Sequence, residues 1–376
     1  MTLPINSSPY TARQARLAET LQAAQFEAAV LNPGPSLVYL TGMHFHLSER
    51  PVVMIFKPGA TPCIVLPELE SAKLKHLDYP IQAFPYTEAV EDWAAAFGRA
   101  AQAAGIDGKT VGVEPRGLRF LEFQFLTNAA PKANFVSAEA NLAALRMYKD
   151  AGEIVAMRKA AEIAQRALQA TLPVVQIGVS EREIASELTL QLLRAGSDPE
   201  LPFAPIISGG PNSANPHATP SKRVLQAGDL LVIDWGASYQ GYFSDITRTF
   251  AIGEIEPEYV RIGQLVLEAN LAGRRIAGPG IEAGQVDQAA RAVIEQGGYG
   301  PYFFHRTGHG LGMEGHEEPY IRSGSTVLLK PGMTFTIEPG IYLPDRNGVR
   351  IEDDVVITED GSESLTNLHR QVTRLV

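Results

Sequence analysis

The chain has 376 residues, a formal net charge of −10 and one cysteine, Cys63. This length suits two domains of ordinary size, and the acidic balance argues against a protein that binds nucleic acid. One cysteine excludes an internal disulfide framework and a cysteine metal cage, and it fits a reducing cytoplasm. Residues 1–11 have neither a basic residue nor an apolar core, so we expect no signal peptide, and no apolar run is long enough to span a membrane.

The first 140 or so residues are predicted to form an α/β domain. Helical periodicity is found at residues 13–25, 68–77, 90–104 and 116–126, and short apolar strands at residues 28–31, 51–56, 63–66 and 110–113. The stretch 57–61 is a hairpin signal between two of these strands. We find no catalytic group of side chains here. His44 and His46 are interpreted as surface histidines rather than as substrate contacts, because isolated histidine pairs are weak motifs.

A boundary is predicted near residues 141–149, which gives domains at residues 1–145 and 146–376. The second domain begins with helices at residues 149–170 and 181–195, and Ser180 with Glu183 forms a capping box before the second of them. Strands follow after Leu201, and further helices are predicted at residues 257–275 and 283–296.

Two aspartates interrupt the most apolar strands of this second domain. Asp234 follows a run of four apolar residues, and Asp245 lies in a second predicted strand after the turn at residues 238–241. With that four-residue turn the two aspartates lie directly opposite each other, whereas a tighter turn at residues 240–241 makes them diagonal neighbours on one face. Carboxylates this close repel unless a cation or a proton compensates them, although a satisfied polar pair at a strand end is the plain alternative.

Histidines cluster further along the chain. The glycine-rich stretch 305–318 contains His305, His309 and His316, and it lacks the Gly-Lys-Ser or Gly-Lys-Thr ending of a phosphate loop. A metal site or an acid–base role suits these imidazoles better. An earlier loop, residues 208–220, carries His217, for which an exposed histidine on an ordinary turn is the simple interpretation.

Two glutamates complete the pattern. Glu338 ends an apolar strand, and Glu352 lies in another, two residues after Arg350, so that a simple ion pair is the alternative for Glu352 alone. Four carboxylates in one apolar core would be very unfavourable without cations. Together with one imidazole they favour Mn, Co, Zn or Fe, and two such metals bridged by carboxylates and a hydroxide form a hydrolytic site.

These residues carry a resemblance to the pita-bread metallopeptidases, the family of Xaa-Pro dipeptidase (prolidase), Xaa-Pro aminopeptidase and methionine aminopeptidase. The matching motifs lie between about residue 149 and the C-terminus: Asp234-Trp235-Gly236-Ala237, Ser244-Asp245-Ile246-Thr247-Arg248-Thr249, Gly308-His309-Gly310-Leu311-Gly312, Glu338-Pro339-Gly340, Arg350-Ile351-Glu352-Asp353, and Gly210-Pro211-Asn212 with His217. The resemblance implies an α+β protein, with a C-terminal pita-bread catalytic domain preceded by a smaller, creatinase-like α/β domain.

The resemblance also implies roles. It gives a two-metal site, with Mn expected before Co, Zn or Fe, whose ligands are Asp234, Asp245, His309, Glu338 and Glu352. Asp245 and Glu352 would bridge the metals. His217 and His316 would donate hydrogen bonds to the substrate carbonyl, and Arg350 would orient Glu352 or bind a substrate carboxylate. Glu338 would also manage the proton of a metal-bridging hydroxide, the expected nucleophile.

The expected activity is hydrolysis of the Xaa-Pro bond of dipeptides or short peptides in the cytoplasm by a homodimer. Xaa-Pro dipeptidase is favoured, and Xaa-Pro aminopeptidase is the alternative. More distant alternatives are a metal-dependent non-peptide amidase and a non-catalytic pita-bread binding module. The complete set of five ligands favours an enzyme over the binding module, because unpaired buried carboxylates are costly.

Overall fold

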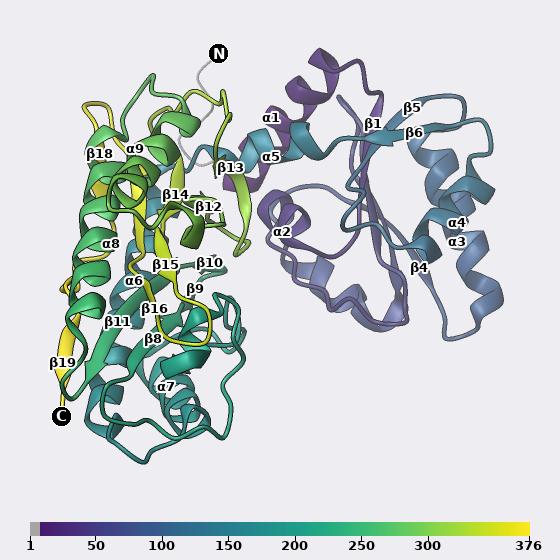
Figure 1. Cartoon of the computed structure of the whole chain (residues 1–376). Coiled ribbons are helices and arrows are strands. Elements are labelled where there is room, and N and C mark those ends of the chain that lie inside the picture. Colours follow the sequence, from purple (N-terminus) through teal and green to yellow (C-terminus); the bar gives the residue numbers. More distant parts are fainter. Residues whose placement is uncertain (1–7) are drawn as a thin grey trace. The chain divides into compact units, whose positions relative to one another are not determined.

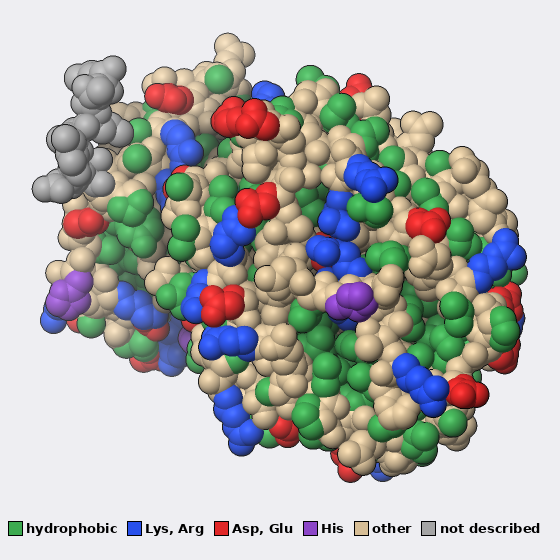
Figure 2. Space-filling model, turned by 90° about the vertical axis from the view of Figure 1, so that its left-hand side faces the viewer, with side chains coloured by type: hydrophobic (Ala, Val, Ile, Leu, Met, Phe, Trp, Pro, Cys, Tyr) green, Lys and Arg blue, Asp and Glu red, His purple; other side chains and the backbone are tan. Residues whose placement is uncertain are grey.

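The computed structural model describes residues 8–376 (Figure 1). Two compact units make up the chain, one ending at Arg146 and the other running from Met147 to Val376. Figure 2 shows acidic and basic side chains interspersed over one face of the molecule, with no basic stripe on the described part of that face. No helix within residues 8–376 combines the length and the apolar character needed to cross a membrane.

The first unit is a six-stranded sheet with helices. The strand order is β4-β3-β2-β1-β5-β6, and the pairs β1/β2 and β2/β3 are antiparallel while the other three are parallel. Its elements are α1 (Pro9–Ala23), β1 (Ala28–Leu31), α2 (Pro35–Thr41), β2 (Val53–Phe56), β3 (Cys63–Pro67), η1 (Glu68–His76), β4 (Gln82–Tyr86), α3 (Val90–Ala104), β5 (Thr110–Val113), α4 (Phe120–Ala129), β6 (Asn134–Ser137) and α5 (Glu139–Met147). Phe97 of α3 and Leu126 of α4 pack with Val30 of β1 in its core.

The sequence located β1, α3 and β5 at their observed bounds, and the hairpin between β2 and β3 is confirmed. Residues 68–76 form a 3₁₀ helix instead of the predicted α-helix. The predicted helix at residues 116–126 begins later, at Phe120. Helices α2 and α5 and strands β4 and β6 were missed, and the two strands lie at the edges of the sheet, where little apolar patterning is needed.

The second unit contains two main sheets. One has the order β19-β11-β8-β7 and the other β13-β12-β14-β17-β18. Their strands are β7 (Ile206–Gly209), β8 (Leu230–Trp235), β11 (Ile246–Ile252), β12 (Gly308–Gly310), β13 (Glu317–Ile321), β14 (Thr334–Ile337), β17 (Asp353–Ile357), β18 (Ser362–Ser364) and β19 (Thr373–Leu375). Two ribbons add β9 (Ser238–Tyr239) with β10 (Tyr242–Phe243), and β15 (Gly340–Tyr342) with β16 (Gly348–Arg350).

Two pairs of helices cover these sheets. The helices are α6 (Ala151–Thr171), α7 (Glu181–Ala195), α8 (Pro257–Ile276) and α9 (Ala283–Gln296), with short 3₁₀ turns η2 (Leu172–Val174), η3 (Gly210–Ala214) and η4 (Gly300–Tyr302). Leu168 of α6 and Leu188 of α7 share a core with Ile233 of β8. Val286 of α9 packs with Phe335 of β14 in the core of the other sheet. Figure 1 shows α8 and α9 lying alongside each other.

The register of the Asp234 hairpin follows the tighter of the two predicted turns. Asp234 of β8 pairs with Thr247 of β11, and Tyr239 pairs with Tyr242. The turn is therefore Gln240-Gly241, and both residues have positive φ, 53° and 77°, as a two-residue hairpin turn of type I′ requires. Asp234 and Asp245 are diagonal neighbours, and the directly opposed arrangement was wrong because it assumed a four-residue turn.

Candidate active site

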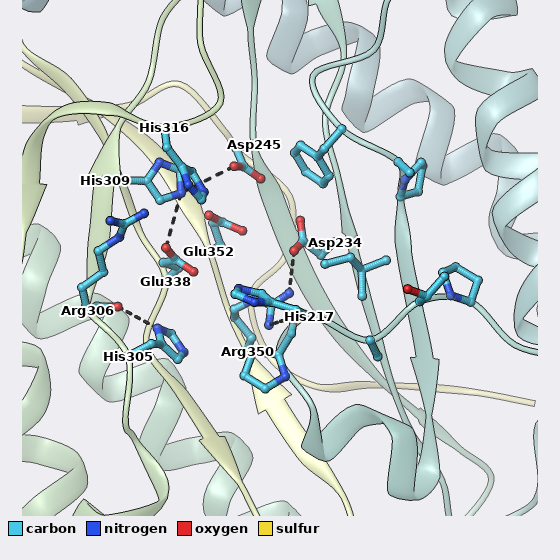
Figure 3. Close-up of a pocket in the computed structure, with 18 residues that line it drawn as sticks. His217, Asp234, Asp245, His305, Arg306, His309, His316, Glu338, Arg350 and Glu352 are labelled. Atoms are coloured by element: carbon cyan, nitrogen blue, oxygen red, sulfur yellow. Dashed lines mark hydrogen bonds and ion pairs between the residues drawn. The ribbon is translucent and has the colours of Figure 1, made fainter. Parts of the chain in front are cut away.

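All eight side chains to which the sequence assigned a role line one cavity of about 610 Å³ (Figure 3). They come from both sheets of the second unit. Asp234 lies on β8 and Asp245 just before β11, while His309 lies on β12. Glu338 follows β14, and Glu352 lies between β16 and β17. An isolated bridge between Thr247 and Glu352 joins the two sheets beside these carboxylates.

The carboxylates and one imidazole point toward a common centre. Asp245, His309 and Glu352 each offer a ligand atom, and these three atoms lie within 4.8 Å of one another. The His309 Nε2 atom is 3.4 Å from Glu338 Oε1 and 3.7 Å from Asp245 Oδ2. Asp234 Oδ1 is buried without a hydrogen-bond partner. This oxygen-rich set, with an unsatisfied carboxylate oxygen inside it, fits divalent cations of the Mn, Co, Zn and Fe type.

The protein alone compensates the negative charge of the cluster only in part, through the ion pair of Arg350 with Asp234. Burial raises the pKa of Asp245 well above its ordinary value, and the negative charges of Glu352 and Asp234 raise it further. Burial likewise raises the pKa of Glu338 to about 8. Burial lowers the pKa of His309 well below its ordinary value, so its imidazole is neutral and has a lone pair for a metal. Both effects favour cation binding, because a cation compensates the negative charge of the carboxylates and accepts the lone pair of the neutral imidazole.

Arg350 uses four of its five N–H donors at one edge of the cavity. Its guanidinium donates from Nη2 to Asp234 Oδ2 at 2.5 Å and from Nε to Thr247 Oγ1 at 3.0 Å. It also donates from Nη1 to the Tyr342 hydroxyl at 3.1 Å and to the Pro216 carbonyl at 3.3 Å. The Thr247 hydroxyl donates in turn to Glu352 Oε2 at 2.6 Å, so one threonine links Arg350 to Glu352. This geometry suits a residue that orients carboxylates.

Three histidines besides His309 line the cavity. The ring of His316 lies beside that of His309, with centroids 4.0 Å apart (Figure 3). His217 enters from the loop that follows η3. His305 lies in the histidine-rich stretch 305–318 but was not among the eight predicted site residues; its Nε2 shares a hydrogen bond with the Tyr342 hydroxyl at 2.9 Å, and burial lowers its pKa to about 4. Tyr342 was also missed, since a lone tyrosine near a turn carries no sequence signal.

The two glycines beside His309 are required by the close approach of neighbouring backbone. A Cβ on Gly308 would lie 1.8 Å from the Thr336 backbone oxygen, and one on Gly310 would lie 2.3 Å from the Glu318 backbone oxygen. Only glycine permits so close an approach of neighbouring strands. These glycines therefore allow β12, which carries His309, to pack closely against the strands on either side of it.

Part of the cavity wall is apolar. Phe203, Pro205, Ile206, Pro216 and Ala218 line it. A pocket with one charged side and one apolar side can bind a small molecule that has a polar reacting group and an apolar body.

Comparisons with known proteins agree with this site. A family described as Metallopeptidase family M24 matches residues 155–359, and one described as Creatinase/Prolidase N-terminal domain matches residues 13–148. The chain is 34% identical to an Xaa-Pro dipeptidase of Pyrococcus horikoshii over 95% of this chain and 97% of that protein. A solved prolidase from Thermococcus sibiricus has a TM-score of 0.93 and 34% identity, covering 98% of this chain and 100% of that one. An X-Pro aminopeptidase from Thermotoga maritima has a TM-score of 0.84 and 30% identity, covering 96% and 99% of the two chains.

Proposed function

Because the chain belongs to metallopeptidase family M24, we propose that it hydrolyses the Xaa-Pro bond of dipeptides in a two-metal site. The family and the fold class predicted from the sequence, a pita-bread domain after a creatinase-like domain, are confirmed. We assign catalysis to residues 146–376, with residues 1–145 as the N-terminal domain. The observation that carries the proposal is a group of three buried carboxylates, Asp234, Asp245 and Glu352, with the partly buried Glu338 beside His309 and an unpartnered oxygen on Asp234.

In the proposed site, Asp234, Asp245, His309, Glu338 and Glu352 hold two divalent cations. When bound, these cations supply Lewis-acid polarisation of the peptide carbonyl and lower the pKa of water. Arg350 and Thr247 fix the orientation of Asp234 and Glu352 through the hydrogen bonds described above. Glu338 receives the proton of the attacking water on a carboxylate oxygen and passes it to the leaving proline nitrogen.

His217 and His316 complete the proposed mechanism. Each donates a ring N–H to the substrate carbonyl oxygen, where negative charge develops as the bond is attacked. The apolar wall formed by Phe203, Pro205 and Ile206 offers a surface for an apolar substrate ring or side chain. Preference for proline itself is taken from the relatives named Xaa-Pro dipeptidase.

Further parts of the proposal rest on the resemblance. These are manganese as the metal, a homodimer, a cytoplasmic location and a short proline-containing peptide as the substrate. The solved X-Pro aminopeptidase among the similar structures keeps that activity as the second candidate. Four of the five N–H donors of Arg350 contact Asp234, Thr247, Tyr342 and Pro216, and binding of a substrate carboxylate stays its alternative role in the proposal.

The test is a matched peptide series with Mn-loaded protein: an Xaa-Pro dipeptide, an Xaa-Pro-Xaa tripeptide, and the dipeptide with Ala in place of Pro. We expect hydrolysis of the Xaa-Pro dipeptide alone. Cleavage of the tripeptide would replace the proposal by an aminopeptidase, and equal cleavage of the Ala peptide would remove the proline preference. In the control variant Asp245→Ala, we expect metal content and activity to fall together while the first unit stays folded.

A further inference from the structure

The loop that carries His217 is closed by a buried acid on a different element. Glu181 is the first residue of α7, it is 0% exposed, and its backbone N–H donates to the Arg223 carbonyl at 3.0 Å. Its two carboxylate oxygens accept hydrogen bonds from both ends of residues 209–221, which we call the His217 loop. No Lys, Arg or His within residues 8–376 forms an ion pair with it.

The contacts are specific for a carboxylate. Glu181 Oε1 accepts from the Gly209 N–H at 2.8 Å and from Asn212 Nδ2 at 2.9 Å. Oε2 accepts from the Ser221 N–H at 2.9 Å, from Ser221 Oγ at 2.7 Å, and from Asn212 Nδ2 at 3.1 Å. Every contact presents a donor, so a side chain with two acceptor oxygens satisfies all of them. The N-terminus of α7 adds a favourable partial positive charge.

The same contacts determine where His217 lies. Gly209 and Ser221 are the ends of the loop, and one carboxylate holds both of them beside Asn212. Inside the loop the His217 N–H donates to Asn215 Oδ1 at 3.1 Å, and the Asn215 N–H donates to the Asn212 carbonyl at 3.0 Å. A continuous set of hydrogen bonds therefore connects Glu181, through Asn212 and Asn215, to the backbone of His217.

The loop is also fastened on the side of the cavity. Ser213 Oγ accepts from the Gly348 N–H at 2.8 Å, and Gly348 begins β16, the strand that ends at Arg350. Arg350 Nη1 donates to the Pro216 carbonyl at 3.3 Å. Glu181 fixes the base of the loop and these two contacts fix its tip, so the backbone that carries His217 is held in place relative to the carboxylate cluster.

We infer that Glu181 is a positioning residue, which acts on the reaction through His217 by clamping the two ends of its loop. The inference rests on the proposed function, in which His217 donates to the substrate carbonyl oxygen. Glu181 does not line the cavity, so it acts on turnover through the residues that it holds and not by contact with the substrate.

The decisive experiment is a double-mutant cycle between Glu181 and His217 in the Mn-loaded enzyme. Glu181→Gln replaces one acceptor oxygen by a donor, and at least two of the five contacts are lost. We expect kcat for an Xaa-Pro dipeptide to fall by about tenfold or more, because small displacements of a catalytic group are costly, with KM and metal content little changed. In the His217→Ala background, the same substitution should leave kcat within about twofold. An equal fold-loss in both backgrounds would show a merely structural residue and overturn the inference.

Two further variants distinguish loss of the loop contacts from a general folding defect. Asn212→Ala removes one partner and leaves three donor contacts on Glu181, so we expect a smaller loss of kcat that also disappears without His217. Ser180→Ala is the matched control, since it removes the N-cap of the same helix and none of the contacts to the loop. We expect it to lower the melting temperature without lowering kcat. A kcat loss in Ser180→Ala equal to that of Glu181→Gln would overturn the inference.

Hydrogen exchange separates this inference from the proposed function. Amides of residues 209–221 should exchange faster in Glu181→Gln than in the wild type or Ser180→Ala, whether or not any peptide is cleaved. If the wild type cleaves no Xaa-Pro peptide, the proposed function fails, and faster exchange still supports the clamp. Unchanged exchange in Glu181→Gln overturns the clamp even in an active prolidase.

Discussion

Asp353 provides the sharpest stability prediction. Its carboxylate is fully buried and contacts three arginines and one threonine. Oδ1 accepts from Arg248 Nη2 at 2.8 Å and from Thr366 Oγ1 at 2.7 Å. Oδ2 accepts from Arg370 Nε at 2.7 Å and lies 3.8 Å from Arg274 Nε. These contacts fasten the C-terminal segment, including residues 366–370, onto β17.

In Asp353→Asn, the amide has nearly the same shape as the carboxylate, but its NH2 group replaces one acceptor oxygen. At least one guanidinium then faces a donor instead of an acceptor. Removing one partner of a buried ion pair costs about 3–5 kcal/mol, because the remaining charge is left buried and uncompensated. For a unit of this size, about 1 kcal/mol shifts the melting temperature by roughly 2–4 °C. The expected decrease is therefore about 8–16 °C for a loss of about 4 kcal/mol.

The assay is calorimetric unfolding of both proteins at equal metal content. Glu363→Gln is the control, since it removes a carboxylate from the half-exposed ion pair with Arg158, and we expect a shift of less than about 1 kcal/mol. A decrease for Asp353→Asn no larger than that of the control would refute the reasoning.

The difference in melting temperature between the wild type and Asp353→Asn also has an expected pH dependence. Burial alone would raise the pKa of Asp353, but the charges of Arg248 and Arg370 outweigh it and hold the pKa well below its ordinary value. A lowered folded-state pKa means that the contribution is complete above the unfolded value of about 3.9 and is lost only as the pH falls below it. The gap in melting temperature should therefore be constant from pH 8 to pH 5, and narrowing within that range would contradict the assignment.

Three further predictions concern the site. His316→Ala should keep both metals but lose about 10²–10³ in kcat, as loss of an oxyanion donor does, and loss of metal instead would make His316 a ligand. Gly308→Ala should fail to fold or lose metal affinity, since its Cβ would lie 1.8 Å from a backbone oxygen, whereas Gly361→Ala, with no atom within 4 Å, should behave as wild type. Protein stripped with a chelator should release protons when metal is added back, because burial first and neighbouring negative charges next raise the pKa of Asp245 and Glu352 in its absence. Metal affinity should then fall as the pH decreases. The check is titration calorimetry in buffers of different ionisation enthalpy, and a measured binding enthalpy that is the same in all buffers would show that no protons are released and would contradict the prediction.

The sequence predicted the elements that carry strong local patterns. The apolar run of β8 and the ends of α3 and α9 follow from periodicity and helix-forming residues, and they were located correctly. The register of the Asp234 hairpin was undecided, because Gln240 has a positive φ that its residue type does not signal. The eight candidate site residues were found because their motifs are specific, and the cavity brings all of them together.

Other functional candidates were invisible for a physical reason. Glu181 stands in a capping motif, where acids are common and usually exposed, so nothing local marks it as buried. Its importance arises only when folding brings Gly209 and Ser221 to the same carboxylate. Tyr342 contacts Arg350 across the β15–β16 ribbon, and His305 joins this pair by a hydrogen bond to the Tyr342 hydroxyl from a segment 37 residues away.

The bridge between Thr247 and Glu352 has a consequence for assembly of the protein. The proposed ligands are divided between the two sheets, with Asp234 and Asp245 on one and His309, Glu338 and Glu352 on the other. Neither half alone presents the whole ligand set, so a folding intermediate with one finished sheet lacks the complete site. Tight metal binding during refolding would then begin only when the two sheets have docked. The bound metals would stabilise the docked arrangement, because their ligands come from both sheets.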